Sequence, residues 1–459
     1  MTLKRSLLVF SMLVCFVVNS QNKKILFGFA EMPNTLMVNP GAETNFKYHA
    51  GIPALSGFSF EVGATQGTIA DLFLKDNTSF STKFENLSDQ LTNRDFLSFN
   101  LQIDVLNGGY RYDEKTYLSF GLYQEVDFVG YYPKDVAELL YYGNQPFLNK
   151  TIHFSDLKYR GEVLGVLHAG ISYKYNKKLN IGGRFKLYSG SVHTSSKNNG
   201  GTFNTSLGTN NVYQHNLSNV NVETYSSGLF NANDELSVSV KDVIGNTILS
   251  KNIGIGVDLG FTYHHTPQLE FTGSILDIGF VSYSKNTSNL TINGDFQFEG
   301  INLLFDANNS DYWSQLDSDF KSNVPRETNQ NSYIAWRPIK LNGAFRYSFG
   351  RARTSKECYE ETYKDYYNNS VGLQLFAVTR PLSTQVAATI FLEKNIGEKF
   401  HAKLTYTVDD YSMTNIGVGV STQIGIVQMY GLVGNFFKMF DLTEATSASL
   451  QFGFNLIFD

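Results

Sequence analysis

Apolar and polar residues alternate along most of this chain, and the clearest case is LQFGFNLIFD at residues 450–459. Successive side chains of a strand point to opposite sides, so alternation sorts them into two faces. The apolar face consists of Leu450, Phe452, Phe454, Leu456 and Phe458. The other face carries Gln451, Gly453 and Asn455, with Ile457 as its one apolar residue. We expect the apolar face to lie against lipid, which covers it as a second protein layer would cover a soluble sheet.

The same alternation recurs in about fourteen segments. The clearest hairpin is residues 171–190, where two alternating runs flank the turn at 176–178. The predicted strands lie at 56–64, 97–105, 118–128, 171–175, 179–187, 253–261, 269–271, 341–347, 371–375, 386–392, 400–408, 416–420, 426–433 and 450–458. Bacterial outer-membrane barrels have an even number of strands. The sequence therefore predicts an all-β fold, a transmembrane antiparallel β-barrel of about fourteen strands with long extracellular loops.

The lengths of the connections agree with this topology when the last strand runs toward the periplasm. Short connections then fall on the periplasmic side, at 112–115, 176–178, 264–268, 394–398 and 423–425. Long ones fall outside, at 65–96, 129–160, 191–251 and 284–334. Short turns inside and long loops outside are typical of outer-membrane barrels. One connection, 349–369, is long for a periplasmic turn.

Three local features modify the barrel pattern. Asp277 would face lipid if the strand from residue 269 continued in register, so we expect a bulge or a strand end there. The Ser/Asn/Gly-rich stretch at 194–211 suggests a mobile external loop. The stretch PKDVAELLYYG predicts a short helix, with Pro133 near its first turn and Gly143 as its stop.

The start of the chain predicts export through a cleaved signal peptide at residues 1–20. Lys4 and Arg5 precede an apolar core at 7–18 that is too short to cross a bilayer comfortably, and a cleavage site follows near Ser20. Cys15 leaves a lipoprotein anchor open as an alternative, although Val14 stands where such a signal carries a small residue.

Composition narrows the class further. Cleavage would leave Cys358 alone, which excludes a disulfide framework and a cysteine metal site. No later segment has eighteen consecutive apolar residues, so we expect no transmembrane helix. The net charge of −5 gives no basic face for nucleic acid. The mean hydropathy of −0.19 still permits a membrane protein, because a barrel hides its apolar residues among alternating polar ones.

Three stretches carry the resemblance to a known family: FGFAEMPNTLMVNPGAE at 27–43, SILDIGFVSYSKNT at 274–287 and LQFGFNLIF at 450–458. They resemble a family of uncharacterised outer-membrane proteins from Bacteroidetes, known only as a domain of unknown function. More loosely, the pattern is similar to the long-chain fatty acid transporter (FadL-like) and PorV class of barrels. The resemblance implies an outer-membrane barrel and offers no catalytic or ligand motif. It also suggests that residues 21–54, which do not alternate cleanly, fold into the lumen as a hatch, with the barrel at 55–459.

Three motifs could indicate chemistry, and each also has a structural interpretation. GIGVDLG at 254–260 has the spacing of a phosphate loop, but its glycines alternate within a strand and open no helix, so we expect them to keep the lumen side small. His264 and His265 could bind a metal, but a third ligand is missing and a solvated turn is the simpler interpretation. A catalytic triad of a barrel lipase is spatial and leaves no sequence motif. We expect neither an enzyme nor a cofactor or metal site.

Polar residues on the inward face of the predicted strands are the remaining candidates for function. They are Glu61, Asp104, Glu125, Asp127, Glu162, His168, Lys174, Arg184, Lys186, Asp258, Glu270, Arg346, His401 and Lys403. Both signs of charge are present, which favours a lumen cross-linked by salt bridges over a selective pore with a ring of one sign.

Two functions follow from these predictions. The first is passage of small hydrophobic ligands through a hatch-gated lumen, which calls for an apolar pocket beside the hatch. The alternative is a scaffold subunit of an envelope secretion or assembly complex, with a plugged lumen and partner surfaces on the loops 191–251 and 284–334. The expected partners are outer-membrane lipid, the barrel insertion machinery and envelope-complex proteins. The terminal strand, Leu450 to Phe458, is the predicted assembly signal.

Overall fold

The computed structural model describes residues 24–30, 32–74, 76–209, 212–230, 239–248, 250–299, 311–351, 367–397, 399–440 and 442–458. The predicted signal peptide and most of the connection 349–369 lie outside these residues. Within the described ranges, no helix combines the length and the apolar character needed to cross a membrane.

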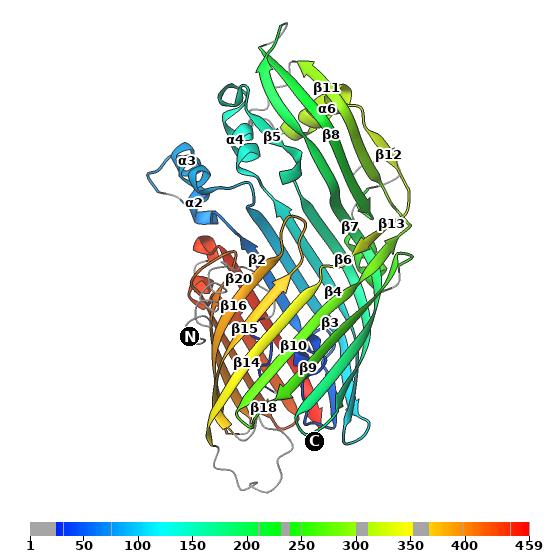
Figure 1. Cartoon of the computed structure of the whole chain (residues 1–459), viewed down its shortest axis with the longest axis vertical. Coiled ribbons are helices and arrows are strands. Elements are labelled where there is room, and N and C mark those ends of the chain that lie inside the picture. Colours follow the sequence, from blue (N-terminus) through cyan, green and yellow to red (C-terminus); the bar gives the residue numbers. More distant parts are fainter. Residues whose placement is uncertain are drawn as a thin grey trace, which may run out of the picture.

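A closed antiparallel barrel of fourteen wall strands forms the larger part of the molecule (Figure 1), as the alternation predicts. The wall consists of β1 (Tyr48–Gly51), β2 (Phe58–Ala64), β3 (Phe96–Arg111), β4 (Thr116–Tyr131), β6 (Tyr159–Lys174), β7 (Leu179–Leu207), β9 (Ile253–His264), β10 (Leu269–Tyr283), β13 (Tyr333–Trp336), β14 (Lys340–Arg351), β15 (Tyr367–Val378), β16 (Gln385–Ile396), β17 (Phe400–Val408), β18 (Asn415–Ile424), β19 (Val427–Gly434) and β20 (Ser447–Phe458). Two wall strands are interrupted. β1 and β2 both lie between β20 and β3, and β13 and β14 both pair with β10.

One end of the barrel carries tight turns. At this end the pairs β3–β4, β6–β7, β9–β10, β16–β17 and β18–β19 are joined by two to four residues. These are the five connections predicted to be short. The chain crosses at the opposite end through long segments that contain helices and further strands (Figure 1).

The long segments build a cap above one side of the barrel. Its sheet has the order β5 (Thr151–His153), β7, β8 (Tyr213–Ser227), β11 (Asn289–Glu299) and β12 (Glu327–Asn329). The helical elements outside the wall are α2 (Ile69–Phe73), α3 (Phe80–Gln90), α4 (Lys134–Tyr142), α5 (Val240–Ile248), α6 (Tyr312–Asn323), η2 (Gln145–Phe147), η3 (Phe154–Asp156), η5 (Phe436–Phe440) and η6 (Leu442–Glu444). Leu139 of α4, Phe203 of β7 and Phe298 of β11 belong to the core of this cap.

The cap corrects one sequence prediction and confirms another. Residues 194–207 are the upper part of the 29-residue strand β7, not a mobile loop. Their backbone groups pair with β8, and Phe203 anchors the strand in the cap core, so the polar composition does not prevent order. The predicted helix is α4, which starts after Pro133 and stops at Gly143, a residue with the positive φ of 73°.

The outer surface of the wall is apolar over a continuous belt. Ile253, Ile255, Val257, Leu259 and Phe261 follow one another along β9, and each is at least 39% exposed. With a rise of about 3.3 Å per residue and a tilt of about 40°, the ten steps from residue 253 to 263 cover about 25 Å, the height of the apolar band of membrane barrels. Aromatic residues gather below the belt, near the tight turns, at Tyr112, Tyr175, Tyr347 and Phe349.

Asp277 lies at the bulge that its charge predicts. It has a positive φ of 61°, and the register between β9 and β10 shifts between Ile275 and Ile278. The shift turns the carboxylate inward, where it is 2% exposed. The neighbouring wall strand is interrupted at the same level, between β13 and β14.

Candidate functional site

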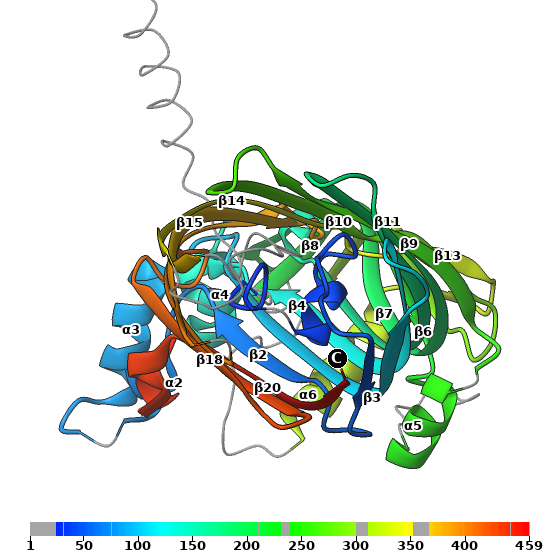
Figure 2. The ribbon, with the colours of Figure 1, turned by 90° about the horizontal axis from the view of Figure 1, so that it is seen from below.

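A hatch, defined here as residues 24–46, occupies the lumen. Its described residues, 24–30 and 32–46, contain one 3₁₀ turn, η1 (Pro33–Met37), and form no strand with the wall (dark blue inside the ring in Figure 2). Phe27, Phe29 and Met32 are no more than 1% exposed. The wall begins at Tyr48, so β1 belongs to the barrel and the predicted boundary at residue 54 is seven residues too late: the β1 residues pair with β20 and β3.

Wall side chains supply the hydrogen bonds that the hatch backbone needs. A buried segment outside any sheet leaves its carbonyl groups without strand partners, and those groups need donors. Wall side chains donate hydrogen bonds to hatch carbonyl oxygens, from Lys403 Nζ to Phe27 O (2.9 Å), from Arg184 to Met37 O (2.7 Å), from Ser274 Oγ to Val38 O (2.6 Å) and from Asn180 Nδ2 to Gly41 O (3.0 Å). The hatch is therefore held in the lumen by side-chain hydrogen bonds and by packing.

The wall makes room for the hatch at two glycines. A Cβ atom on Gly260 would lie 2.1 Å from Asn39 Oδ1, and one on Gly182 would lie 2.0 Å from the Pro40 carbonyl oxygen. Gly260 belongs to the motif GIGVDLG, whose glycines were predicted to keep the lumen side small. β9 gives it the strand conformation that excludes a phosphate loop.

We expect Gly260→Val to loosen the hatch, because the new side chain takes the space of Asn39 and Pro40. Hydrogen exchange of the hatch amides should become faster while exchange in the wall stays slow. Gly343→Val is the matched control, since a Cβ at Gly343 meets nothing within 4 Å. Equal exchange in both variants would show that the two glycines do not set the position of the hatch.

A chain of buried ion pairs crosses the upper lumen and ends on the hatch. Arg337 lies 3.8 Å from Asp277, whose other oxygen is 2.5 Å from Lys186 Nζ. Lys186 also contacts Asp258 at 2.9 Å, and Asp258 lies 2.5 Å from Arg184. Arg184 donates to the Met37 carbonyl, so the ladder Arg337–Asp277–Lys186–Asp258–Arg184 connects the top of the lumen to the hatch.

A second ionic cluster lies lower in the lumen. Glu393 accepts from Arg346 at 2.6 Å and from Lys403 at 3.1 Å, and Arg346 is 3.6 Å from Glu270. Both cations also bond to hatch carbonyls, at Phe27 and Gly28. Charges of both signs thus lie in pairs in the lumen, and each partner offsets part of the cost of burying the other.

The inward residues predicted from alternation lie in this polar interior. Those that are at most 5% exposed are Glu61, Asp104, Glu125, Asp127, Glu162, His168, Arg184, Lys186, Asp258, Glu270, Arg346 and Lys403. Lys174 and His401 are half-buried. The sequence analysis did not name Lys340 and Glu393 as inward residues, although both occupy inward-facing positions of their strands. It could not find Arg337 and Arg380, which lie in breaks between strands.

Ile457, the apolar exception on the polar face of the terminal strand, packs against the hatch. It is 4% exposed and shares a cluster with Leu36, Ala42 and Phe46. Its apolar side chain therefore fits the inward face at this position.

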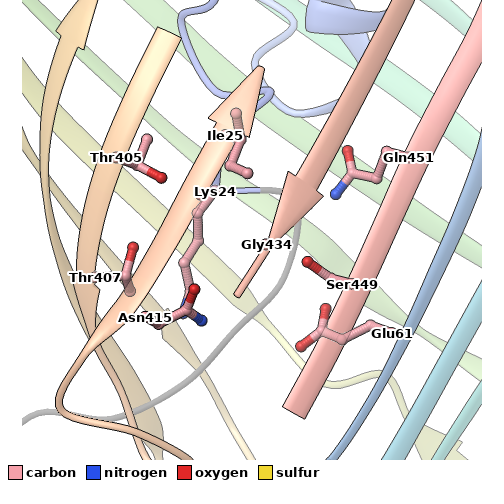
Figure 3. A pocket seen from close by; sticks show the side chains of 10 residues that line it. Lys24, Ile25, Glu61, Thr405, Thr407, Asn415, Gly434, Ser449 and Gln451 are labelled. Atoms are coloured by element: carbon pink, nitrogen blue, oxygen red, sulfur yellow. The ribbon is translucent and has the colours of Figure 1, made fainter. Parts of the chain in front are cut away.

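The tip of the hatch closes the lumen beside β2, β17 and β18. Lys24 Nζ lies 3.1 Å from Asp409 Oδ2, and Lys24 and Glu61 reach into the same small cavity from two sides (Figure 3). This cavity has a volume of about 20 Å³, and two others beside the hatch have about 30 and 10 Å³. Each is large enough for about one water molecule. None of these three cavities can hold a ligand. A larger cavity of about 680 Å³ lies at the wall, where Gly182, Gly260 and Ser274 contact the hatch and exposed apolar residues such as Leu259 and Phe261 line it as well.

A further cavity of about 810 Å³ opens between the cap and the top of the barrel. We call it the vestibule. Its aromatic lining is Tyr225, Tyr333, Trp336 and His193, and its charged lining is Lys158, Arg160, Lys197, Arg337, Arg380 and Glu223. Arg337 forms part of the floor, so the vestibule stands directly above the ionic ladder. A volume of 300–1,000 Å³ with aromatic walls and a few polar groups is typical of ligand sites.

Among the residues that the structure describes, Lys158 and Lys197 are the vestibule cations that form no ion pair with a carboxylate. Arg160, Arg337 and Arg380 pair with Glu162, Glu125 and Asp127. Lys158 Nζ instead contacts the Lys197 carbonyl at 3.4 Å, and Lys197 Nζ contacts Tyr225 Oη at 3.2 Å, both neutral oxygens. Desolvation by partial burial lowers the pKa of Lys158. An anionic group arriving in the vestibule would offset that loss of hydration.

Only one histidine of the pair at the tight-turn end has the expected solvated geometry: His265 is exposed, whereas His264 is buried. His264 is 2% exposed and lies 3.0 Å from Glu43 of the hatch and 3.9 Å from Glu270. Across the described ranges, no group of three or more His, Cys, Asp and Glu side chains is arranged to hold a metal ion. His264 therefore acts as a further contact between hatch and wall.

Comparison with known proteins gives one family and several barrels. A model described as "Family of unknown function (DUF5723)" matches residues 40–434, from the hatch through β19. No curated protein matches the chain. The Ralstonia pickettii toluene transporter TbuX has 11% identity and a TM-score of 0.41, covering 97% of this chain and 100% of its own. The P. putida toluene transporter TodX has 10% identity and a TM-score of 0.38, with 96% and 95% covered. A Pseudomonas aeruginosa FadL homologue has 8% identity and a TM-score of 0.39, with 96% and 97% covered.

Proposed function

This chain belongs to the DUF5723 family of unknown function, and from this premise we propose that it is an integral outer-membrane barrel that admits small hydrophobic ligands through a hatch-gated lumen. The apolar belt supports the membrane location, since about 25 Å of exposed apolar wall needs lipid as its solvent. The tight turns then face the periplasm and the cap faces outward. No step in this function requires an enzyme or a cofactor.

The observation that carries the proposal is the vestibule above the hatch. The vestibule has the volume of a ligand site, and its floor residue Arg337 starts the ladder of ion pairs that ends on Met37 of the hatch. A ligand that draws Arg337 away from Asp277 would weaken the first link of the ladder. The three cavities of about 10 to 30 Å³ beside the hatch each leave room for about one water molecule, so we interpret this arrangement as a closed state.

The lining of the vestibule suggests which hydrophobic ligands fit best. Tyr225 and Tyr333, with ring centroids 4.8 Å apart, provide an apolar contact surface, and Trp336 also lines the cavity, although its ring packs on Phe280. Lys158 and Lys197 supply positive charge that carboxylates do not already neutralise. We infer a preference for an apolar ligand with one anionic end.

Titration of the purified protein with laurate tests this proposal through the emission of Trp336. With Trp313 replaced by Phe, laurate should change the emission at lower concentration than neutral dodecanol, because only laurate can pair with the lysines. Lys158→Ala combined with Lys197→Ala should remove that preference, and Lys115→Ala in a tight turn should not. If laurate and dodecanol act alike on the native lysines, the anionic preference is wrong; if neither acts, the vestibule is not the ligand site.

A second candidate function is a scaffold in an envelope complex, and the cap favours it. The cap is an ordered sheet with its own core, and the hatch occupies the lumen below it. A transporter that only needs an entrance has no evident use for so large an outer layer. Isolation of the tagged protein in mild detergent with a stoichiometric partner, lost when the cap is shortened, would favour the scaffold.

A further inference from the structure

Helix α5 (Val240–Ile248) lies on the outside of the barrel wall. In the view along the barrel it stands beyond the ring of strands, next to β6 and β7 (Figure 2). Its partners on the wall are the outward faces of three strands. Gln124 of β4 donates to Thr247 Oγ1 at 2.7 Å, and Ser189 of β7 donates to the Asn246 carbonyl at 2.7 Å.

The wall is shaped to receive this helix. Gly165 of β6 faces outward between Leu164 and Val166, which are fully buried on the lumen side. A Cβ atom at Gly165 would lie 1.6 Å from the Thr247 carbonyl oxygen, so the close approach needs glycine. Gln124 and Ser189 are polar residues on a surface that is otherwise apolar, and α5 satisfies both. Thr247, the residue against the wall, is 3% exposed.

A second side of α5, adjacent to the one that Thr247 presents to the wall, is apolar and uncovered within the described structure. Ile244 and Ile248 lie four residues apart, hence on one side of the helix, and are 50% and 63% exposed. This face continues the belt of the wall. Ser189, which holds the helix, pairs with Ile253, the first belt residue of β9, and two residues further along β7 Leu187 is 41% exposed.

We propose that α5 is an interfacial helix whose occupant is lipid of the outer leaflet: its polar side docks on the wall and Ile244 and Ile248 enter the boundary between headgroups and acyl chains. This inference rests on the proposed membrane location of the barrel. Interfacial helices bury an apolar face about 5–10 Å into that boundary and keep charges in water. Asp242 lies away from the two isoleucines, and Lys241, three residues before Ile244 on the same side, can reach water from the end of the helix.

The depth of α5 can be measured with a single tryptophan in vesicles of phosphatidylcholine brominated at known acyl positions. Trp313 and Trp336 are first replaced by Phe, and Ile248→Trp or, as a second site, Ile244→Trp provides the reporter. We expect quenching of the emission, strongest with bromine near the headgroup. Leu187→Trp in the belt should be quenched most by bromine deeper in the chain, and Leu207→Trp at the cap tip, where the native residue is 70% exposed, should not be quenched.

The two control positions separate this inference from the proposed function. Quenching at position 187 with none at 244 and 248 would overturn the interfacial helix and leave the membrane barrel in place, and it would turn attention to a protein partner for this face. Absence of quenching at 187 as well would overturn the membrane barrel itself. If lipid brominated deep in the acyl chain quenched a tryptophan at position 244 or 248 as strongly as one at position 187, the helix would lie within the belt and not at its edge.

Discussion

Deletion of residues 24–46 is expected to turn a closed barrel into a conducting one. The hatch lies inside the barrel, and three cavities beside it measure only about 10 to 30 Å³. The wall starts only at Tyr48, and every wall strand keeps its partners in the deletion variant. An eight-stranded barrel is filled by its own side chains, whereas a barrel of about sixteen strands holds an aqueous channel, so fourteen strands without a hatch should leave an open path.

The measurement is single-channel conductance in planar bilayers. The full-length protein should show almost none, and the variant should show stable openings with weak ion selectivity, because the lumen carries both signs of charge. Arg184 and Lys403 lose carbonyl partners in the variant but become hydrated, so the barrel should still fold and run as a heat-modifiable band. Strong conductance of the full-length protein would show that the hatch does not close the lumen.

The strands could be predicted from the sequence because the wall separates two opposite environments. Lipid outside and a polar, hatch-filled lumen inside force a period of two on every wall strand, as in β9, where exposed Ile255 and Val257 flank Gly256 on the lumen side. The same rule placed Asp277 at a bulge, since its phase contradicted its charge. The wall is also interrupted between β1 and β2 and between β13 and β14. The sequence there shows no such conflict between charge and strand phase, so these interruptions were not predicted.

The site was less predictable because its parts do not lie on regular strands. Arg337 links the vestibule to the ladder. It lies between β13 and β14, outside any strand, so alternation does not predict which way its side chain points. Residues 194–207, the cap part of β7, are polar on both faces, so alternation does not identify them as a strand. Their order depends on pairing with β8 and on the core around Phe203. Much of the bonding between hatch and wall runs through hatch backbone carbonyls, which carry no sequence signal.

The terminal strand β20 closes the barrel, and its removal is expected to abolish assembly. Residues 450–456 pair with β19 on one side, and the strand pairs with β2 and β1 on the other. Phe452 and Phe58 stack across this seam with ring centroids 4.9 Å apart. Deleting 450–459 would leave two strand edges in lipid, where backbone groups find no partner. The truncated chain should be absent from the outer-membrane fraction and show no heat-modifiable band.

A single substitution in the same strand should give a graded effect. Phe454 is half-buried on the lipid face of β20, near the middle of the strand. Phe454→Arg should lower the free energy of unfolding by about 2–4 kcal/mol, the cost of a charge at the bilayer midplane. Phe454→Leu is the matched control and should stay close to the native value in equilibrium unfolding from vesicles.

The polar face of β20 offers no neutral control, because Asn455 holds the hatch. Its Nδ2 donates to Asn34 Oδ1 at 2.8 Å, and the residue is fully buried. Asn455→Asp would remove that donor and bury a carboxylate, so we expect it to release the hatch as well as to lower stability.

Recovery of the truncated protein as a folded band in the outer membrane would contradict closure by β20, and with it the assembly signal at Leu450, Phe452, Phe454, Leu456 and Phe458. A native-like stability of Phe454→Arg would instead place residue 454 away from the acyl chains, so the two experiments separate closure of the barrel from its depth in the membrane.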